Sequence, residues 1–219
     1  MKKPDNPQAK KIPHQHQIHS DVRHDPYFWM RERDSKLVLS HIQKENEYAQ
    51  RFLKKYKTLT KTLFGEMKSR VKEADTSAPT KRDHYFYYVR YEKGKEYAIY
   101  CRKKDSLNNK EEIILDVNQL AKGKKYLSAA VVDISPNHQI LTFAVDDVGR
   151  RLYTIYFKDL KSGKTLSQKI KNTTGHWVWS NDNQTGFYTQ QNKETLRSER
   201  VCRFSLQRKK SDMVYFEDD

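Results

Sequence analysis

The spacing of hydrophobic positions changes once along the chain, near residue 79. From residue 34 to 71 apolar residues recur every three or four positions, which predicts one long helix or two consecutive helices. Asp34 or Ser35 is the expected N-cap, because an oxygen there accepts a hydrogen bond from a free amide of the first turn. The helical stripe consists of Val38, Ile42, Ala49, Phe52, Tyr56, Leu59, Leu63, Met67 and Val71.

After Pro79 the apolar spacing becomes two, and aromatic and β-branched residues dominate. Residues 84–90 and 97–102 predict a hairpin that turns at residues 92–95. The segments between later strands hold Asn, Asp, Gly, Ser and Pro, as turns require. Further strands are predicted at 112–115, 129–134, 139–145, 152–160, 166–170, 177–180, 186–190 and 201–206.

Part of this strand pattern repeats. Residues 133–144 are echoed by residues 178–189, and comparable strands follow at 152–160 and 200–206. A four-stranded unit that recurs every 40–50 residues or so is typical of a β-propeller blade, with a β-sandwich of coincidental spacing as the alternative. Only two or three such units fit, so the first and last blades lack neighbours and the propeller is expected to be incomplete.

The expected fold is therefore mainly β with an N-terminal α segment, in three parts. Residues 1–19 are polar, contain three prolines and show no periodicity, which predicts a mobile lead-in. Residues 20–78 form the helical segment, and residues 79–219 form the first two to three blades of a partial propeller.

The chain is basic, with 43 Lys and Arg against 28 Asp and Glu and a net charge of +15. Such a charge attracts nucleic acids, anionic lipids or acidic proteins. The basic residues are scattered among acidic ones, which favours a solvated basic surface. A stand-alone basic module that binds nucleic acid or acidic proteins remains the alternative, although the aromatic segment 85–91 lacks the RNP1 pattern of RNA-binding sheets.

We expect a soluble, cytoplasmic chain. The N-terminus has no apolar core of a signal peptide, and no segment approaches the roughly 20 apolar residues that span a bilayer. Cys101 and Cys202 are far apart and belong to no C-x-x-C pair, so a reducing compartment fits better than a disulfide framework.

No arrangement of residues predicts catalysis, cofactor binding or a metal site. The glycines are too dispersed for a G-x-S-x-G nucleophile elbow, a P-loop or a dinucleotide fingerprint. His14, His16 and His19 form H-x-H-x-x-H, but they lack a carboxylate or cysteine partner on a rigid element. Turn formation explains the acidic pairs 146–147 and 218–219, and blade packing explains residues 177 and 179, two tryptophans on one strand face.

Several segments, taken in order, resemble oligopeptidase B, within the prolyl oligopeptidase family of serine peptidases. The resemblance covers nearly everything from about residue 19 onward, and the ordered set is more specific than any one motif. Its segments are 25–31 (DPYFWMR), 38–39 and 45–48 (VL, ENEY), 66–67 (EM), 97–102 (YAIYCR), 114–118 (ILDVN), 135–137 (SPN) and 212–219 (DMVYFEDD), the last being similar to the stretch before a third blade.

The resemblance implies a gating propeller that caps an α/β-hydrolase domain with a Ser, Asp, His triad, in an enzyme that cuts short peptides after Lys or Arg. It places the triad outside these residues, so no catalytic residue transfers to this sequence. The expected partners are that hydrolase domain and the remaining blades. The sequence departs from the family at Cys202, where an aromatic residue is frequent, and at 207–210, where a glycine turn is usual.

Overall fold

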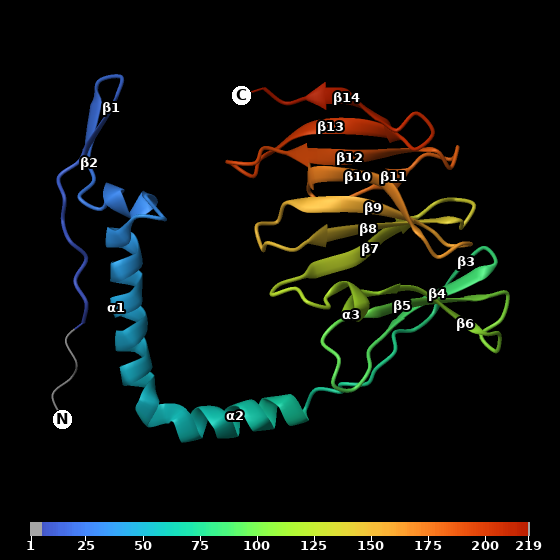
Figure 1. Cartoon of the computed structure of the whole chain (residues 1–219), viewed down its shortest axis with the longest axis horizontal. Coiled ribbons are helices and arrows are strands. Elements are labelled where there is room, and N and C mark those ends of the chain that lie inside the picture. The colour runs from blue at the N-terminus through green and yellow to red at the C-terminus, as the bar shows by residue number, and fades with distance from the viewer. Residues whose placement is uncertain (1–5, 219) are drawn as a thin grey trace. The chain divides into compact units, whose positions relative to one another are not determined.

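The computed structural model describes residues 6–218 and divides into two compact units, residues 1–71 and 72–219 (Figure 1). The first unit holds a short hairpin and the helices. The second holds the remaining twelve strands and one further short helix, α3. No helix in the described range is long and apolar enough to cross a membrane.

The first unit begins with a β-hairpin that the sequence interpretation did not include. Strands β1 (Gln15–Ile18) and β2 (Asp21–His24) pair antiparallel. Two backbone hydrogen bonds at the open end of the hairpin, from Ile12 N to Pro26 O and from Asp25 N to His14 O, extend it. Residues 1–5 of the expected lead-in lie outside the described residues, and the mobility of the remainder stays a prediction.

The helical pattern corresponds to two consecutive helices, which was one of the two arrangements predicted for residues 34–71. A single 3-10 turn, η2 (Lys54–Tyr56), joins α1 (Lys36–Leu53) to α2 (Lys57–Ser69), and a 3-10 turn η1 (Phe28–Arg31) precedes them. Of the two N-cap candidates Ser35 is the one used, because its Oγ accepts a hydrogen bond from Val38 N at 3.3 Å.

The second unit starts with a four-stranded antiparallel sheet, blade 1. Its strands follow in chain order: β3 (Thr80–Arg82), β4 (Tyr85–Arg90), β5 (Ile99–Lys104) and β6 (Glu111–Asp116). The predicted hairpin is β4–β5, and Gly94 takes φ +75° in its turn. Helix α3 (Val117–Leu120) follows, with Asp116 as its N-cap.

Two further sets of four strands complete the second unit. Blade 2 is β7 (Ser128–Ile134), β8 (Ile140–Asp146), β9 (Tyr153–Asp159) and β10 (Thr165–Thr173). Blade 3 is β11 (Val178–Trp179), β12 (Thr185–Gln191), β13 (Ser198–Ser205) and β14 (Lys210–Phe216). A single pair of residues, Thr173 and Gln190, joins the two blades into one continuous sheet.

The C-terminal residues form a strand that the sequence pattern did not predict. The resemblance placed residues 212–219 before a third blade, whereas residues 210–216 form β14, the outermost strand of that blade. The reason is the turn after β13: Lys209 takes φ +54°, and this left-handed residue lets the chain reverse and pair with β13 from Ser205–Lys210 to Arg200–Phe216. Short β3 was also missed.

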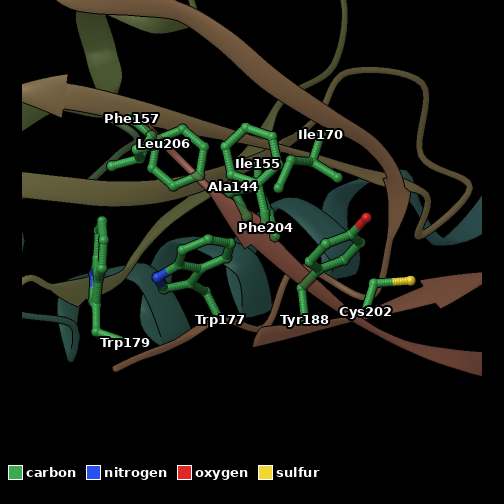
Figure 2. Close-up of a cluster of buried hydrophobic side chains, with 10 residues drawn as sticks. All are labelled: Ala144, Ile155, Phe157, Ile170, Trp177, Trp179, Tyr188, Cys202, Phe204 and Leu206. Atoms are coloured by element: carbon green, nitrogen blue, oxygen red, sulfur yellow. The ribbon is translucent and has the colours of Figure 1, made fainter. Parts of the chain in front are cut away.

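Apolar seams hold neighbouring blades together. Leu115, Leu141 and Phe143 belong to the cluster between blades 1 and 2, and ten residues form the cluster between blades 2 and 3 (Figure 2). In the second cluster the rings of Trp177 and Trp179 lie 5.2 Å apart, edge to face. Both tryptophans are buried, so blade packing is their role, as predicted.

Replacing Gly186 by alanine should destabilise blade 3. A Cβ at this position would lie closer than 3.0 Å to the buried ring of Trp177, and overpacking of a core costs about 1–3 kcal/mol or more. Guanidinium unfolding followed by tryptophan fluorescence measures the loss.

The matched control is Gly65→Ala in α2, where a Cβ meets nothing within 4 Å. This change should stabilise the helix by roughly 0.5–1 kcal/mol, as measured by far-UV circular dichroism. Equal effects of the two substitutions would contradict the packing described for Gly186.

Candidate functional site

Two of the three histidines in the H-x-H-x-x-H pattern pack against an aromatic ring. The His14 ring stacks on Phe28 at 3.7 Å, His16 meets the same ring edge-on at 4.4 Å, and His19 takes φ +56° in the β1–β2 turn. Between residues 6 and 218 no three His, Cys, Asp or Glu side chains are grouped so as to hold a metal ion.

Asp146 shows the turn chemistry expected of the 146–147 pair. It is 2% exposed, and its carboxylate accepts hydrogen bonds from the backbone N–H groups of Val148, Gly149 and Arg151 at 2.7–3.0 Å. This buried carboxylate fixes the β8–β9 loop. The second pair includes Asp219, which lies outside the described residues, so its interpretation stays a prediction.

Both cysteines are free and buried, and neither is placed as a nucleophile. Burial raises the pKa of the Cys101 thiol to about 11, so it is protonated at neutral pH. A protonated, buried thiol is a poor nucleophile.

A polar cluster joins the first two blades at the end of their inner strands. The His138 ring is 8% exposed, with Nε2 2.9 Å from Asp83 Oδ2 and Nδ1 2.8 Å from Tyr87 Oη. The hydrogen bond with His138 holds the pKa of the Asp83 carboxyl below its usual value. We call this cluster the His138 clasp, and it links the β3–β4 turn of blade 1 to the β7–β8 turn of blade 2.

Arg102 of β5 adds a second polar contact between blade 1 and His138. It is 5% exposed, and its guanidinium donates to both carboxylate oxygens of Glu112 at 2.8 and 2.9 Å and to His138 O at 2.7 Å. Burial alone would lower the pKa of Arg102, but the hydrogen bonds with Glu112 outweigh it and raise the pKa. The arginine therefore stays charged and connects blade 1 directly to the turn of blade 2.

The next seam repeats the contact with different residues. Asn137 N, in the β7–β8 turn, donates to Asn183 Oδ1 in the β11–β12 turn at 2.7 Å. Asp83, His138 and Asn183 each take φ between +52° and +60° in the corresponding turn of their blades. The same left-handed turn position thus hydrogen-bonds one blade to the next throughout the described set.

The two outward blade faces differ. On blade 1, Glu111 accepts hydrogen bonds from Tyr88 Oη at 2.6 Å and from Arg90, which covers the buried Ile99 and Cys101 with a polar network. The outward face of blade 3 carries exposed apolar side chains, with Val178 opposite Phe187 and Val201 opposite Tyr215. The Arg203–Asp212 ion pair, at 3.4 Å, lies on the same blade with Arg203 in register with Phe187.

The first unit carries a second exposed apolar surface, along α1 and α2. Apart from Val38, which is 6% exposed, every residue of the predicted helical stripe is exposed, with Leu59, Leu63 and Met67 at 55%, 48% and 68%. Lys55 Nζ lies 4.8 Å from the ring centroids of Phe52 and Tyr56, yet both residues remain 41% exposed. Sequence periodicity found the stripe, and the structure adds that most of it is exposed within its own unit.

Three four-stranded blades in chain order, joined by apolar seams and ending in an uncovered face, define part of a β-propeller. Comparison with known proteins agrees: a family model for the N-terminal β-propeller domain of prolyl oligopeptidase matches residues 7–219. The chain belongs to the prolyl oligopeptidase family and corresponds to its N-terminal propeller domain.

The individual proteins that match this chain are also named as peptidases. Protease 2 of Moraxella lacunata is 35% identical over 84% of this chain, and dipeptidyl aminopeptidase BI of Pseudoxanthomonas mexicana is 34% identical over 97%. The structure of oligopeptidase B from Leishmania major matches 98% of the chain with a TM-score of 0.87 and 33% identity. The chain spans 28%, 32% and 33% of the length of these three proteins, respectively.

The Asp83→Asn variant should show reduced stability with a defined pH dependence. Because the folded-state pKa of Asp83 is lowered, its ionised form stabilises the fold above the unfolded-state pKa, about 3.9, and this contribution is lost as the pH falls through the folded value. The variant should therefore be less stable than the parent chain at pH 7, with the difference shrinking toward pH 3. Thermal melts across that range measure it.

Asp105→Asn is the matched control. Asp105 also has a left-handed backbone and lies beside a histidine, but its partner His84 is 81% exposed in the side chain, so the pair is screened by solvent. Its substitution should leave the pH dependence unchanged. Equal responses of the two variants would rule out the His138 clasp as a stabilising contact.

Proposed function

We propose that this chain serves a serine oligopeptidase as part of a gating propeller and as a packing surface for an α/β-hydrolase domain. The whole enzyme would hydrolyse short peptides after Lys or Arg, and the propeller would admit such peptides while excluding folded proteins. In this proposal residues 20–78 pack on the hydrolase domain and residues 79–219 provide the first blades. A cytoplasmic location is part of the proposal, and the two free, buried thiols support it.

The exposed apolar stripe on α1 and α2 is the observation that carries the packing role. Six of its members, Phe52, Tyr56, Leu59, Leu63, Met67 and Val71, are each at least 41% exposed. Burial of apolar surface contributes about 25 cal/mol per Å², so covering these side chains would make the binding of a partner more favourable. A surface of this extent on a helix pair is typical of an interface.

The outward face of blade 3 supports the same proposal. Propellers bury their blade faces by radial repetition, and an apolar face such as that of Phe187 and Val201 fits against a further blade. In this proposal catalysis belongs to residues outside this sequence, which has no G-x-S-x-G motif.

A basic binding module is the second candidate, and the net charge of +15 is the observation that favours it. Salt distinguishes the two functions. Specific phosphate contacts give an affinity that falls steeply as salt increases and that depends on a defined set of cations. A propeller portion should bind nucleic acid only weakly and without such a set.

The purified chain should not hydrolyse a reporter peptide that ends in Arg or Lys. The expected rate equals that of buffer alone, because no nucleophile is activated in the described residues. Turnover that a serine-directed inhibitor abolishes would contradict the assignment of catalysis to residues outside this sequence.

The purified chain should also bind a hydrophobic dye through the α2 part of the stripe. Leu59→Ser combined with Leu63→Ser should reduce the dye fluorescence severalfold, because both side chains are exposed members of the stripe. Thr58→Ser combined with Thr62→Ser, on the same helix but outside the stripe, is the control. An unchanged signal in the leucine variant would exclude the stripe as an uncovered interface.

A further inference from the structure

A groove of about 520 Å³ opens between blades 2 and 3 on the side of their outer strands. Its origin is the sheet geometry: β10 pairs with β12 only at Thr173 and Gln190, so the two blades diverge beyond that point. Residues 169–172 of β10 form one wall, and β12, β13 and the β13–β14 turn form the floor and the other wall. The proposed function makes no use of this groove.

The groove is lined by four cationic side chains and by no acidic one: Lys169, Lys171, Arg200 and Lys209. In the described part of the chain, no ion pair involves any of the three lysines. Arg200 pairs with Glu199 at 3.3 Å and lies over the Phe216 ring. Like charges gathered around one cavity repel each other, and a bound anion removes that cost.

The floor of the groove combines apolar surface with hydrogen-bonding groups. Ile170, Cys202 and Phe204 are buried there. Tyr188 Oη donates to Ser211 Oγ at 2.9 Å, and this hydroxyl pair lies among the lining residues. An apolar floor beneath a cationic rim suits an organic anion better than an inorganic one, because the organic part also removes apolar surface from water.

Two departures noted in the sequence meet in this groove. Cys202 places a small thiol on the floor, and Lys209 adds a cation at the rim. Lys209 also has φ +54°, a backbone conformation that glycine adopts readily and lysine seldom does. Lys209 therefore combines an uncommon turn conformation with a cation at the rim of the groove.

We propose that the groove is a binding site for a small organic polyanion that carries phosphate or carboxylate groups and spans blades 2 and 3. The anionic groups contact Lys169, Lys171 and Lys209, and the organic part lies on Met213, a lining residue that is 62% exposed. Because the ligand contacts both blades, its binding stabilises their seam and raises the melting temperature.

Calorimetric titration and thermal melts of the whole chain test the site. The probes are ATP as a phosphate ligand with an organic part, citrate as a carboxylate ligand, tripolyphosphate as an inorganic polyanion, and adenosine as an uncharged control. We expect saturable binding of ATP or citrate with a raised melting temperature, weaker binding of tripolyphosphate, and no binding of adenosine. The ATP and citrate arms distinguish phosphate from carboxylate ligands.

The decisive variant is Lys209→Gly, which removes the cation and relieves the left-handed backbone. It should lower the affinity about tenfold or more while leaving the melting temperature of the free chain unchanged or higher. Lys169→Ala combined with Lys171→Ala should have a similar effect on affinity. Lys164→Ala combined with Lys193→Ala, two exposed lysines outside the groove, is the control with the same change in charge.

Four outcomes would overturn the proposal. They are an equal loss of affinity in the control variant, binding of adenosine as tight as that of ATP, an absence of saturable binding by ATP and citrate at millimolar concentration, and tighter binding of a single-stranded oligonucleotide that is insensitive to Lys209→Gly. The last outcome would indicate a nucleic-acid surface elsewhere on the chain.

Discussion

Each blade of this protein is a twisted four-stranded sheet that cannot bury both of its faces alone, and this constraint determines most of the structure. Blade 2 solves it by packing one face on blade 1 and the other on blade 3, which buries Leu141 and Phe157 completely. The ring of Phe157 lies 5.0 Å from Trp177 across the second seam. Because a fully buried aromatic side chain is worth on the order of 2 kcal/mol, these seams supply much of the stability of the second unit.

Apolar packing between blades is not directional, and hydrogen bonds between the blades add specific pairwise contacts. The turn between the first and second strand of each blade carries a left-handed residue, and its neighbourhood hydrogen-bonds to the corresponding turn of the next blade. Asp83 with His138 and Asn137 with Asn183 are two versions of that contact. The residue types differ, so the repeated element is the backbone geometry rather than the sequence.

The same constraint leaves surface uncovered in both units. A blade at the end of a set has one face without a neighbour, and on blade 3 that face includes the exposed side chains of Phe187 and Val201. The helical unit has a comparable uncovered surface along α1 and α2. The proposed interdomain role rests on these two surfaces, and the chain spans about a third of its relatives' length.

The amino-acid sequence by itself determined the local elements: the helical segment capped at Asp34 or Ser35, the hairpin turning at residues 92–95, and the strands whose alternation marks a half-buried sheet. These depend on residues close in sequence, so periodicity and turn chemistry reveal them. Strands β1, β2 and β3 escaped because they are short and polar, and β14 because its pairing depends on a left-handed Lys209. The His138 clasp and the cationic groove were decided only by tertiary structure, since each joins residues of different blades through contacts that no local pattern encodes.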